Sequence, residues 1–224
     1  MKERGIIFNS EMVRAILDGR KTQTRRVVNN AIPGNCLWLK KPTKTRSGTT
    51  THVLDAPKYN LCPLGGVGDR LWVRETFALL GNEDGVCVDW NDNILKASEE
   101  QAARIYKASC EQKDGDYGLW SIPDDADWKP HTDNHKYDGT WTPSIHMPRW
   151  ASRITLEITD VRVERLQEAS DDDFKAEGYP LERELTGGST DAFCWFRHLW
   201  DSVSKPDCNY ESNPWVWVIE FKRV

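Results

Sequence analysis

The stretch that decides the fold reads Ser-Arg-Ile-Thr-Leu-Glu-Ile-Thr-Asp-Val-Arg-Val-Glu-Arg and runs from Ser152 to Arg165. Apolar and polar side chains alternate along it, which is the pattern of a β-strand that buries one face. Three apolar residues share one parity and two later valines share the other: Ile154, Leu156 and Ile158, then Val161 and Val163. The parity changes at Thr159 and Asp160, which predicts a β-bulge or a bend, as at the corner of a barrel.

The other elements are read outward from this strand. Residues 215–221 are apolar on both faces, which predicts a central strand. Further strands are expected at residues 6–8 and 70–77, with an edge or site-wall strand at 20–28. Helices are expected over 9–18, over 191–202 and from Ser170, whose spacing to Asp173 resembles a capping box, to the stop at Gly178. Residues 29–63 read as loop.

The pattern predicts an α+β fold that is mainly β, a small barrel with flanking helices. Residues 1–224 are expected to form a single domain, because their number suits one large domain. Residues 79–142 are rich in Asp, Asn, Gly and Pro, with one plausible helix near 99–107. They read as a loop-rich insertion of irregular structure within that domain.

Composition excludes several classes of protein. No apolar run approaches the roughly 18 residues that a membrane span needs, and the first residues do not read as a signal peptide. Six scattered cysteines form no C-x-x-C pair and are expected to be reduced thiols in a cytoplasmic protein. The 11 tryptophans are an excess that suits either core packing or stacking platforms, the latter in loops such as the one that holds Trp38.

Charge is unevenly distributed. Residues 1–50 hold eleven Lys or Arg and three acids, whereas the whole chain has a net charge of −5. A basic segment on an acidic body indicates either a surface for a phosphate-bearing partner or a solvated face balanced by acids folded beside it.

The segment from Gly19 to Arg26 is the first candidate site. Its four cations repel one another, so an anionic ligand or nearby carboxylates should offset them. Burial among arginines would lower the pKa of Lys21 and let it act as a base, with Thr24 as the nucleophile. Positions 21 and 24 face opposite ways on a straight strand, so this pair needs Lys21 in the turn or a bend in the strand.

Two carboxylates are further candidates. Glu177 is expected in the last turn of a helix, where the dipole disfavours an anion, so it is either solvated or held to face a cation such as Lys21. Glu75 shares its parity with Leu71 and Val73. It either ends a strand in solvent or points inward, where it needs a partner that the basic segment could supply.

Histidines give weaker signals. His146 lies in a proline-bounded segment near Arg149 and Arg153, which either lines a base-binding pocket or forms a structural loop. His131 and His135 have a spacing that suits a metal on a helix, but the surrounding residues favour a loop. We expect neither a metal nor a cofactor.

At these residues the sequence resembles a known family. The run Gly19-x-Lys21-x-x-Thr24-x-Arg26 resembles the signature of ASCH domains, which belong to the PUA-like superfamily. Further similar pieces follow in order: Gly68-Asp69-x-Leu71, Ala176-Glu177-Gly178 and Val218–Phe221. The long form is similar to prophage-encoded ASCH-like proteins labelled morphogenetic. The resemblance covers residues 5–28, 65–78 and 143–224.

The resemblance implies a PUA-like barrel whose cleft takes a nucleoside, a nucleotide or single-stranded RNA. Many ASCH domains have Glu at the place of Thr24, and Thr there resembles the small bacterial branch that deacetylates N4-acetylcytidine. By that analogy Thr24 attacks the amide carbonyl, Lys21 takes its proton and Glu177 assists proton transfer. The residues expected to contact ligand are Arg25, Arg26, Glu75, His146, Arg149 and Arg153.

Three functions therefore stand as hypotheses. The first is an amidohydrolase that acts on an N4-acylated cytosine nucleoside. The second is a non-catalytic module that binds RNA or nucleotides through the same cleft, and the third is a phage assembly factor. No membrane partner is expected, and the sequence is silent on the oligomeric state.

Overall fold

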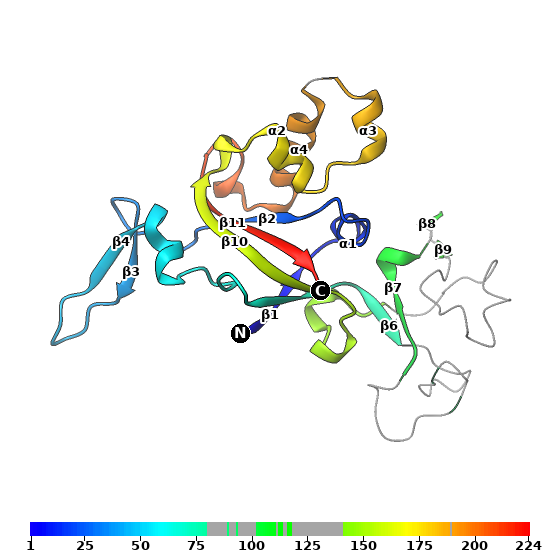
Figure 1. Cartoon of the computed structure of the whole chain (residues 1–224), viewed down its shortest axis with the longest axis horizontal. Helices are drawn as coiled ribbons and strands as arrows, with labels where there is room; N and C mark the ends of the chain where they lie inside the picture. The colour runs from blue at the N-terminus through cyan, green and yellow to red at the C-terminus, as the bar shows by residue number, and fades with distance from the viewer. Residues whose placement is uncertain are drawn as a thin grey trace. The chain divides into compact units, whose positions relative to one another are not determined.

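A computed structural model of the chain describes residues 1–79, 89, 93, 102–110, 112–113, 116–117, 141–188 and 190–224. Its largest sheet has five strands (Figure 1). Their hydrogen-bonded order is β1 (Glu3–Ile7), β5 (Arg70–Arg74), β10 (Thr155–Arg165), β11 (Trp215–Arg223) and β2 (Gln23–Val27). Together with four α-helices in the described residues, this confirms the α+β class, mainly β.

The chain divides into two compact units, and each is described by itself. The first comprises Met1–Arg4, Ala15–Leu71 and Thr155–Val224. The second comprises Gly5–Arg14 and Trp72–Ile154. The expectation of one domain with an insertion at 79–142 stays a prediction, and most of that insertion lies outside the described residues.

Strands β10, β11 and β2 form the part of the sheet that positions the candidate site. Strand β11 pairs antiparallel with both neighbours, so the prediction of a central strand is confirmed. The register of β10 against β11 shifts between Ile158 and Asp160, where the change of parity predicts a bulge. The shift lets Ile158 and Val163 both be buried, although their positions differ by an odd number.

The expected closure into a barrel is not seen in the described part of the chain. The order begins at β1 and ends at β2, which makes an open sheet. Just before β2, Lys21 forms a β-bridge with Glu177, and Thr22 donates its backbone N–H to Ala176. The free edge beside β2 is therefore covered by the end of a helix, which is one way to protect an edge without closing a barrel.

The core of the first unit lies between the sheet and two helices, α2 (Asp171–Ala176) and α4 (Asp191–Val203). Helix α3 (Leu181–Thr186) connects them and exposes Leu185. The buried cluster consists of Leu166, Phe174, Phe196, Trp200, Tyr210, Val216 and Val218. The predicted start of α2 is confirmed, because Ser170 and Asp173 form a capping box, and Gly178 follows with a φ of 104°.

The prediction of loop over residues 29–63 is wrong in part. Strands β3 (Cys36–Lys40) and β4 (Thr49–His52) pair as an antiparallel hairpin, and a 3-10 helix follows at Val53–Tyr59. The threonines of β4 are β-branched and suit a strand, but β3 is apolar at four successive positions and β4 is polar throughout, so neither strand shows the alternation of a half-buried strand.

The second unit contains β6 (Phe77–Leu79) paired with β7 (Arg104–Tyr106), and β8 (Gln112–Lys113) paired with β9 (Asp116–Tyr117). The helix expected near 99–107 is wrong where the structure describes it, because residues 104–106 form a strand and a 3-10 helix follows at Lys107–Ser109. Ile105 and Tyr106 are both buried, and Tyr106 lies opposite Phe77 in the pairing of β7 with β6 and packs in the same buried cluster.

Helix α1 (Ser10–Leu17) forms as predicted, with Asn9 Oδ1 accepting the N–H of Met12. Within the described residues, the remaining 3-10 helices are Ser144–His146, Arg149–Ala151, Leu166–Glu168 and Pro206–Cys208. Among the described helices, none is both long and apolar enough to span a membrane.

Candidate functional site

The turn after α1 brings the basic segment against the end of α2. Gly19 has a φ of 77°, a conformation that glycine adopts without strain, and Lys21 then donates its backbone N–H to Ala15 at 2.9 Å. Gly178 lies so close that an added Cβ would be 3.2 Å from the Cβ of Lys21. Two glycines therefore let Lys21 approach Glu177. Lys21 precedes strand β2, which is the position that a pairing of Lys21 with Thr24 would need.

Lys21 and Glu177 form a buried ion pair. The Lys21 Nζ is 2.6 Å from Glu177 Oε2 and also donates to the Glu177 backbone oxygen at 2.9 Å. Only 2% of Lys21 and 5% of Glu177 is exposed. Burial lowers the pKa of Lys21 below its ordinary value, although the charge of Glu177 works against that change. The hypothesis that Glu177 is held to face Lys21 is confirmed.

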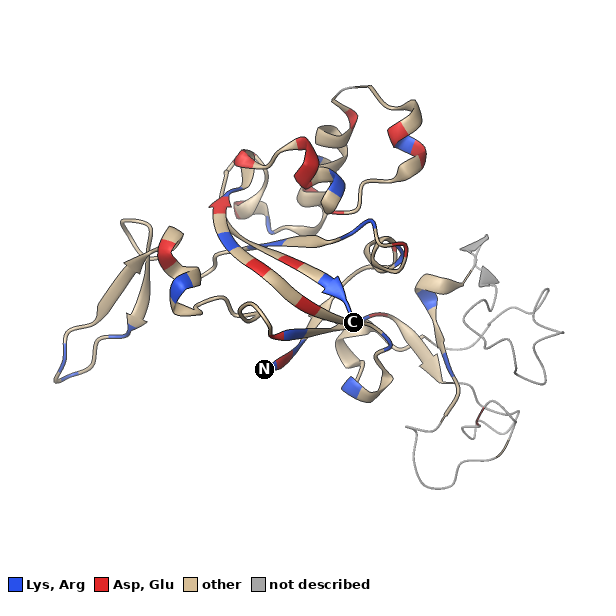
Figure 2. Cartoon of the chain, viewed as in Figure 1, with Lys and Arg blue, Asp and Glu red and all other residues tan. Residues whose placement is uncertain are grey.

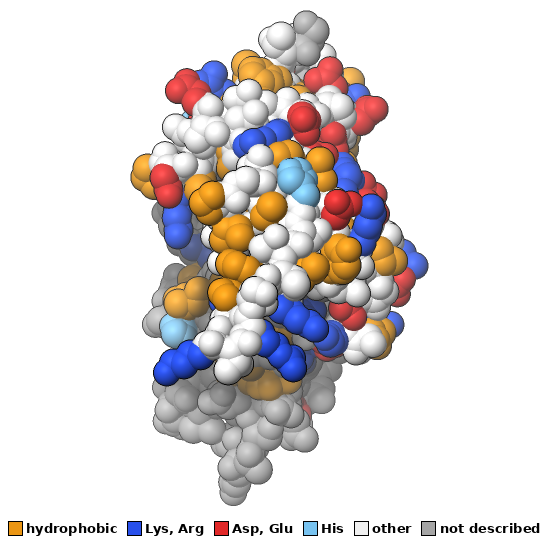
Figure 3. Space-filling view, turned by 90° about the vertical axis from the view of Figure 1, so that its left-hand side faces the viewer, with side chains coloured by type: hydrophobic (Ala, Val, Ile, Leu, Met, Phe, Trp, Pro, Cys, Tyr) orange, Lys and Arg blue, Asp and Glu red, His pale blue; other side chains and the backbone are white. Residues whose placement is uncertain are grey.

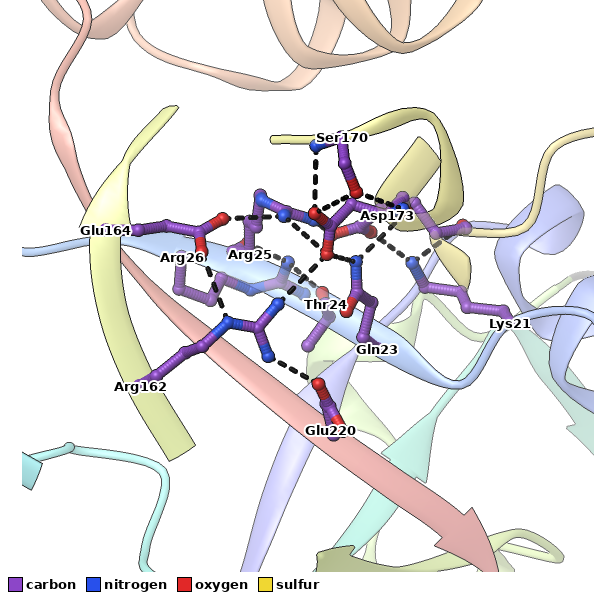
Figure 4. Close-up of polar contacts among 11 residues, drawn as sticks. Lys21, Gln23, Thr24, Arg25, Arg26, Arg162, Glu164, Ser170, Asp173 and Glu220 are labelled. Atoms are coloured by element: carbon purple, nitrogen blue, oxygen red, sulfur yellow. Dashed lines mark hydrogen bonds and ion pairs between the residues drawn. The ribbon is translucent and has the colours of Figure 1, made fainter. Parts of the chain in front are cut away.

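Arg25 extends this pair into a network with three carboxylates (Figure 4). Its Nη2 lies 2.7 Å from Glu164 and 3.1 Å from Asp173, and its Nη1 lies 3.2 Å from Glu177. Burial acts to lower the pKa of Arg25, but the carboxylates outweigh it, and the pKa is raised. The carboxylates that offset the basic segment therefore come from the protein itself.

Arg162 holds the outer side of the same network, as Figure 4 shows. Its guanidinium pairs with Asp173 at 2.9 Å, with Glu164 at 3.2 Å and with Glu220. Burial would raise the pKa of Asp173, but hydrogen bonds from Ser170 and Gln23 and the charge of Arg25 together lower it.

Thr24 lies on the other face of β2. Alternation along the strand puts Gln23 and Arg25 on one face and Thr24 and Arg26 on the opposite one. Thr24 is 1% exposed, and its Oγ1 accepts a hydrogen bond from Arg26 Nη1 at 2.8 Å. Burial lowers the pKa of Arg26.

The structure thus joins Lys21, Arg25 and Glu177 by direct contacts, and it joins Thr24 to Arg26. Arg162 and Glu164 are network members that were not predicted from the sequence. Arg162 and Glu164 are two positions apart on β10, and alternate residues of a strand lie on one face. This spacing could have indicated that they belong to one cluster.

The other expected ligand residues lie in the second unit. Glu75 is 2% exposed, as an inward orientation requires. Its two oxygens accept bidentate hydrogen bonds from Arg153 at 2.9 and 3.0 Å, so its partner is Arg153 and not the basic segment. His146 and Arg149 are exposed, in neighbouring 3-10 helices.

The histidine pair His131 and His135 lies outside the described residues. Among the residues that the structure does describe, no group of three His, Cys, Asp or Glu side chains is arranged to hold a metal.

Comparison with known proteins adds little. No family model matches the chain, and no curated protein matches it. Among solved structures, a crystal structure of an ASCH domain from Lactobacillus crispatus JV V101 is similar over 99% of this chain and 79% of that chain. The two are 11% identical, with a TM-score of 0.36, which is too low to support an argument.

Proposed function

We propose that the protein is a nucleobase-directed amidohydrolase that acts on an N4-acylated cytosine nucleoside. The observation that carries this proposal is the buried contact of 2.6 Å between Lys21 and Glu177. Because burial lowers the pKa of Lys21, the amine loses its proton more readily and can act as a base. Strongly perturbed groups of this kind concentrate at functional sites.

In the proposed reaction the hydroxyl oxygen of Thr24 bonds to the acyl carbon, and its proton goes to the Lys21 amine. The bond from the acyl carbon to N4 then breaks, and Lys21 returns the proton to the departing N4 amine. Water next cleaves the acyl-threonine ester and releases the carboxylic acid. Glu177 assists these proton transfers: it first accepts a proton from the Lys21 ammonium, which leaves the free amine as the base, and it then pairs with the ammonium that forms on Lys21.

Arg26 supports the choice of nucleophile. A hydroxyl has one donor proton and two acceptor positions. The bond from Arg26 occupies an acceptor position of Thr24, so the proton of Thr24 stays available for transfer to a base. The guanidinium also stabilises negative charge that develops on this oxygen.

The proposal requires movement. Lys21 and Thr24 are 2% and 1% exposed, so a substrate reaches them only after the residues that cover them open. Thr24 lies on the face of β2 opposite Gln23 and Arg25, so the start of β2 must also turn to bring the Thr24 hydroxyl within reach of Lys21 Nζ. Binding of the cytosine ring would have to drive that opening, as in enzymes in which substrate binding completes the site.

The test is release of cytidine from N4-acetylcytidine by the purified protein. We expect Thr24→Ala and Lys21→Ala each to lower kcat/KM by about 100-fold or more, the range for removal of a nucleophile or base. Thr24→Ser should keep part of the activity, since it retains the hydroxyl. Thr22→Ala is the matched control, because Thr22 is exposed and only its backbone is engaged.

A wild-type protein that turns over no N4-acylated cytosine nucleoside would contradict the proposal. The contact of Thr24 with Arg26, on the face of β2 opposite Gln23 and Arg25, favours one alternative, a non-catalytic module that binds nucleotides or RNA. That alternative expects cytidine nucleotides to bind without turnover and to bind more weakly to Arg26→Ala. The phage assembly role stays a hypothesis.

A further inference from the structure

We propose that the β3–β4 hairpin and the pocket at its base bind single-stranded nucleic acid, with a base in the pocket and backbone phosphates on the cations of the hairpin. This surface lies in residues 27–63 and 217, apart from the Lys21 network, and the inference does not rest on the proposed amidohydrolase activity. Each of its parts belongs to the first compact unit.

The hairpin carries unbalanced positive charge. The sequence contains no Asp or Glu between Asp18 and Asp55. Four exposed cations lie at the end of β3 and in the turn before β4: Lys40, Lys41, Lys44 and Arg46. Figure 2 shows this hairpin with blue residues and no red ones. Within the described part of the chain, none of the four forms an ion pair.

Among the described residues, other cations of the same unit, unlike these four, form ion pairs. Arg25 of the same carboxylate-free stretch meets three carboxylates from elsewhere in the chain, and Lys58 pairs with Asp55 at 2.7 Å. Cations without a carboxylate partner are the ones that polyanion phosphates can occupy, with release of bound counterions.

A pocket of about 810 Å³ adjoins these cations. This volume is in the range of sites for small organic ligands. Its lining combines the half-buried indole of Trp38, the exposed amides of Asn29 and Asn30 and the exposed ammonium of Lys41, with the buried Trp217 at its base. In Figure 3, which shows the side of the molecule that carries the hairpin, hydrophobic side chains gather next to Lys and Arg side chains.

Trp38 packs against the turn of its own hairpin. A Cβ on Gly48 would lie only 2.2 Å from the Trp38 ring, so glycine is what lets the chain just before β4 pass this close to the indole. An indole that neighbouring atoms constrain loses less conformational entropy when a base stacks on it.

The shape and chemistry favour a single strand over other polyanions. A base can enter a pocket only when it is unstacked, as in single strands, and amide side chains can hydrogen-bond the edges of a base. An acidic peptide would match the cations but would leave the indoles and amides without a planar partner. Lys41 lines the pocket and belongs to the cation set, so one nucleotide can contact both features.

The test is fluorescence anisotropy of the full chain with a labelled oligouridylate of about twelve nucleotides. We expect replacement of Lys40, Lys41, Lys44 and Arg46 by Ala to weaken binding at least about tenfold at low salt. The slope of log K against log salt should become shallower by about 0.7 for each phosphate that the variant no longer neutralises. Lys58→Ala removes an exposed cation that Asp55 already neutralises, and it should leave both quantities unchanged.

A second set of ligands tests the pocket without changing the protein. We expect an abasic strand of the same length to bind on the order of tenfold more weakly, because it has no bases to stack. Duplex RNA and polyglutamate should bind more weakly than the single strand. Equal binding of the abasic strand, preference for duplex or polyglutamate, or equal effects of the hairpin and Lys58 variants would overturn the proposal. Because nucleoside turnover is assayed separately, this result is independent of the proposed function.

Discussion

At the scale of the residue, the buried cations of the chain are paired with carboxylates that are distant in sequence. Lys21 and Arg25 are 2% and 3% exposed, which would be costly if either were unpaired. Glu177 contacts both of them, through Oε2 and Oε1 respectively. One carboxylate thus links the base proposed for the reaction to the guanidinium that holds the helix to the sheet.

Replacing Arg25 tests this interpretation. Arg25→Met leaves three carboxylates near one another without their shared cation, so we expect the free energy of unfolding to fall by about 3–5 kcal/mol. Arg197→Met is the control, because the pair of Arg197 with Glu211 is exposed and should be worth less than about 1 kcal/mol. Urea unfolding measures both. Equal decreases would show that Arg25 contributes no more than a surface ion pair.

At the scale of the element, α2 is short and depends on its ends. Six residues cannot form a stable helix alone, so the cap and the packing of Phe174 must hold it. The side chain of Ser170 accepts the N–H of Asp173, and Asp173 accepts from the backbone of Ser170. The same Asp173 pairs with Arg25 and Arg162, so the cap and the ion network share a residue.

Removing the cap should destabilise the protein. For Ser170→Ala we expect the free energy of unfolding to fall by about 1 kcal/mol, the usual effect of removing an N-cap side chain. Ser202→Ala, on the exposed part of α4, removes a serine that caps no helix start and should change stability by no more than about 0.5 kcal/mol. Thermal melts followed by circular dichroism compare the two variants, and indistinguishable midpoints would argue against the cap.

At the scale of the whole molecule, the basic N-terminal segment divides into two parts. Within residues 19–26, Lys21 and Arg25 are neutralised in the interior by carboxylates of β10, α2 and its C-terminal end. The hairpin cations are left exposed. The alternative of an internally balanced face therefore holds for Lys21 and Arg25, whereas a phosphate-binding surface is what we propose for the hairpin.

The internal carboxylates also make stability depend on pH. The pKa of Asp173 is lowered in the folded chain, so its contribution is complete above its unfolded value of about 3.9 and is lost as the pH falls toward the folded value. We expect Asp173→Asn to be less stable at pH 7 and to lose less further stability between pH values of about 5 and 3.

The matched control for this titration is Asp171→Asn, an exposed carboxylate of the same helical turn. Urea unfolding at a series of pH values gives the slopes. If Asp173→Asn retains the acid dependence of the wild type, the carboxylate of Asp173 is not its source.

Several elements could be predicted from the sequence because their signals are local. The alternation and bulge of β10, the central β11 and the capping box of α2 each depend on residues within one segment. Periodicity reports which face is buried, and capping residues report where a helix starts, so neither needs knowledge of the partner. For Glu177 the sequence offered two alternatives, a solvated carboxylate or one that faces Lys21, because the helix dipole disfavours an anion at that end; the structure shows the second.

Only the tertiary structure decided which charges meet. Arg25 and Glu177 are 152 positions apart, and Glu75 found its partner in Arg153. The sequence shows that a buried charge needs a counter-charge, but several candidates satisfy that need equally, and the register of strands chooses among them. The hairpin and the open sheet also escaped prediction, because neither hairpin strand alternates and because the pairing of Lys21 with Glu177 at a helix end joins residues distant in sequence.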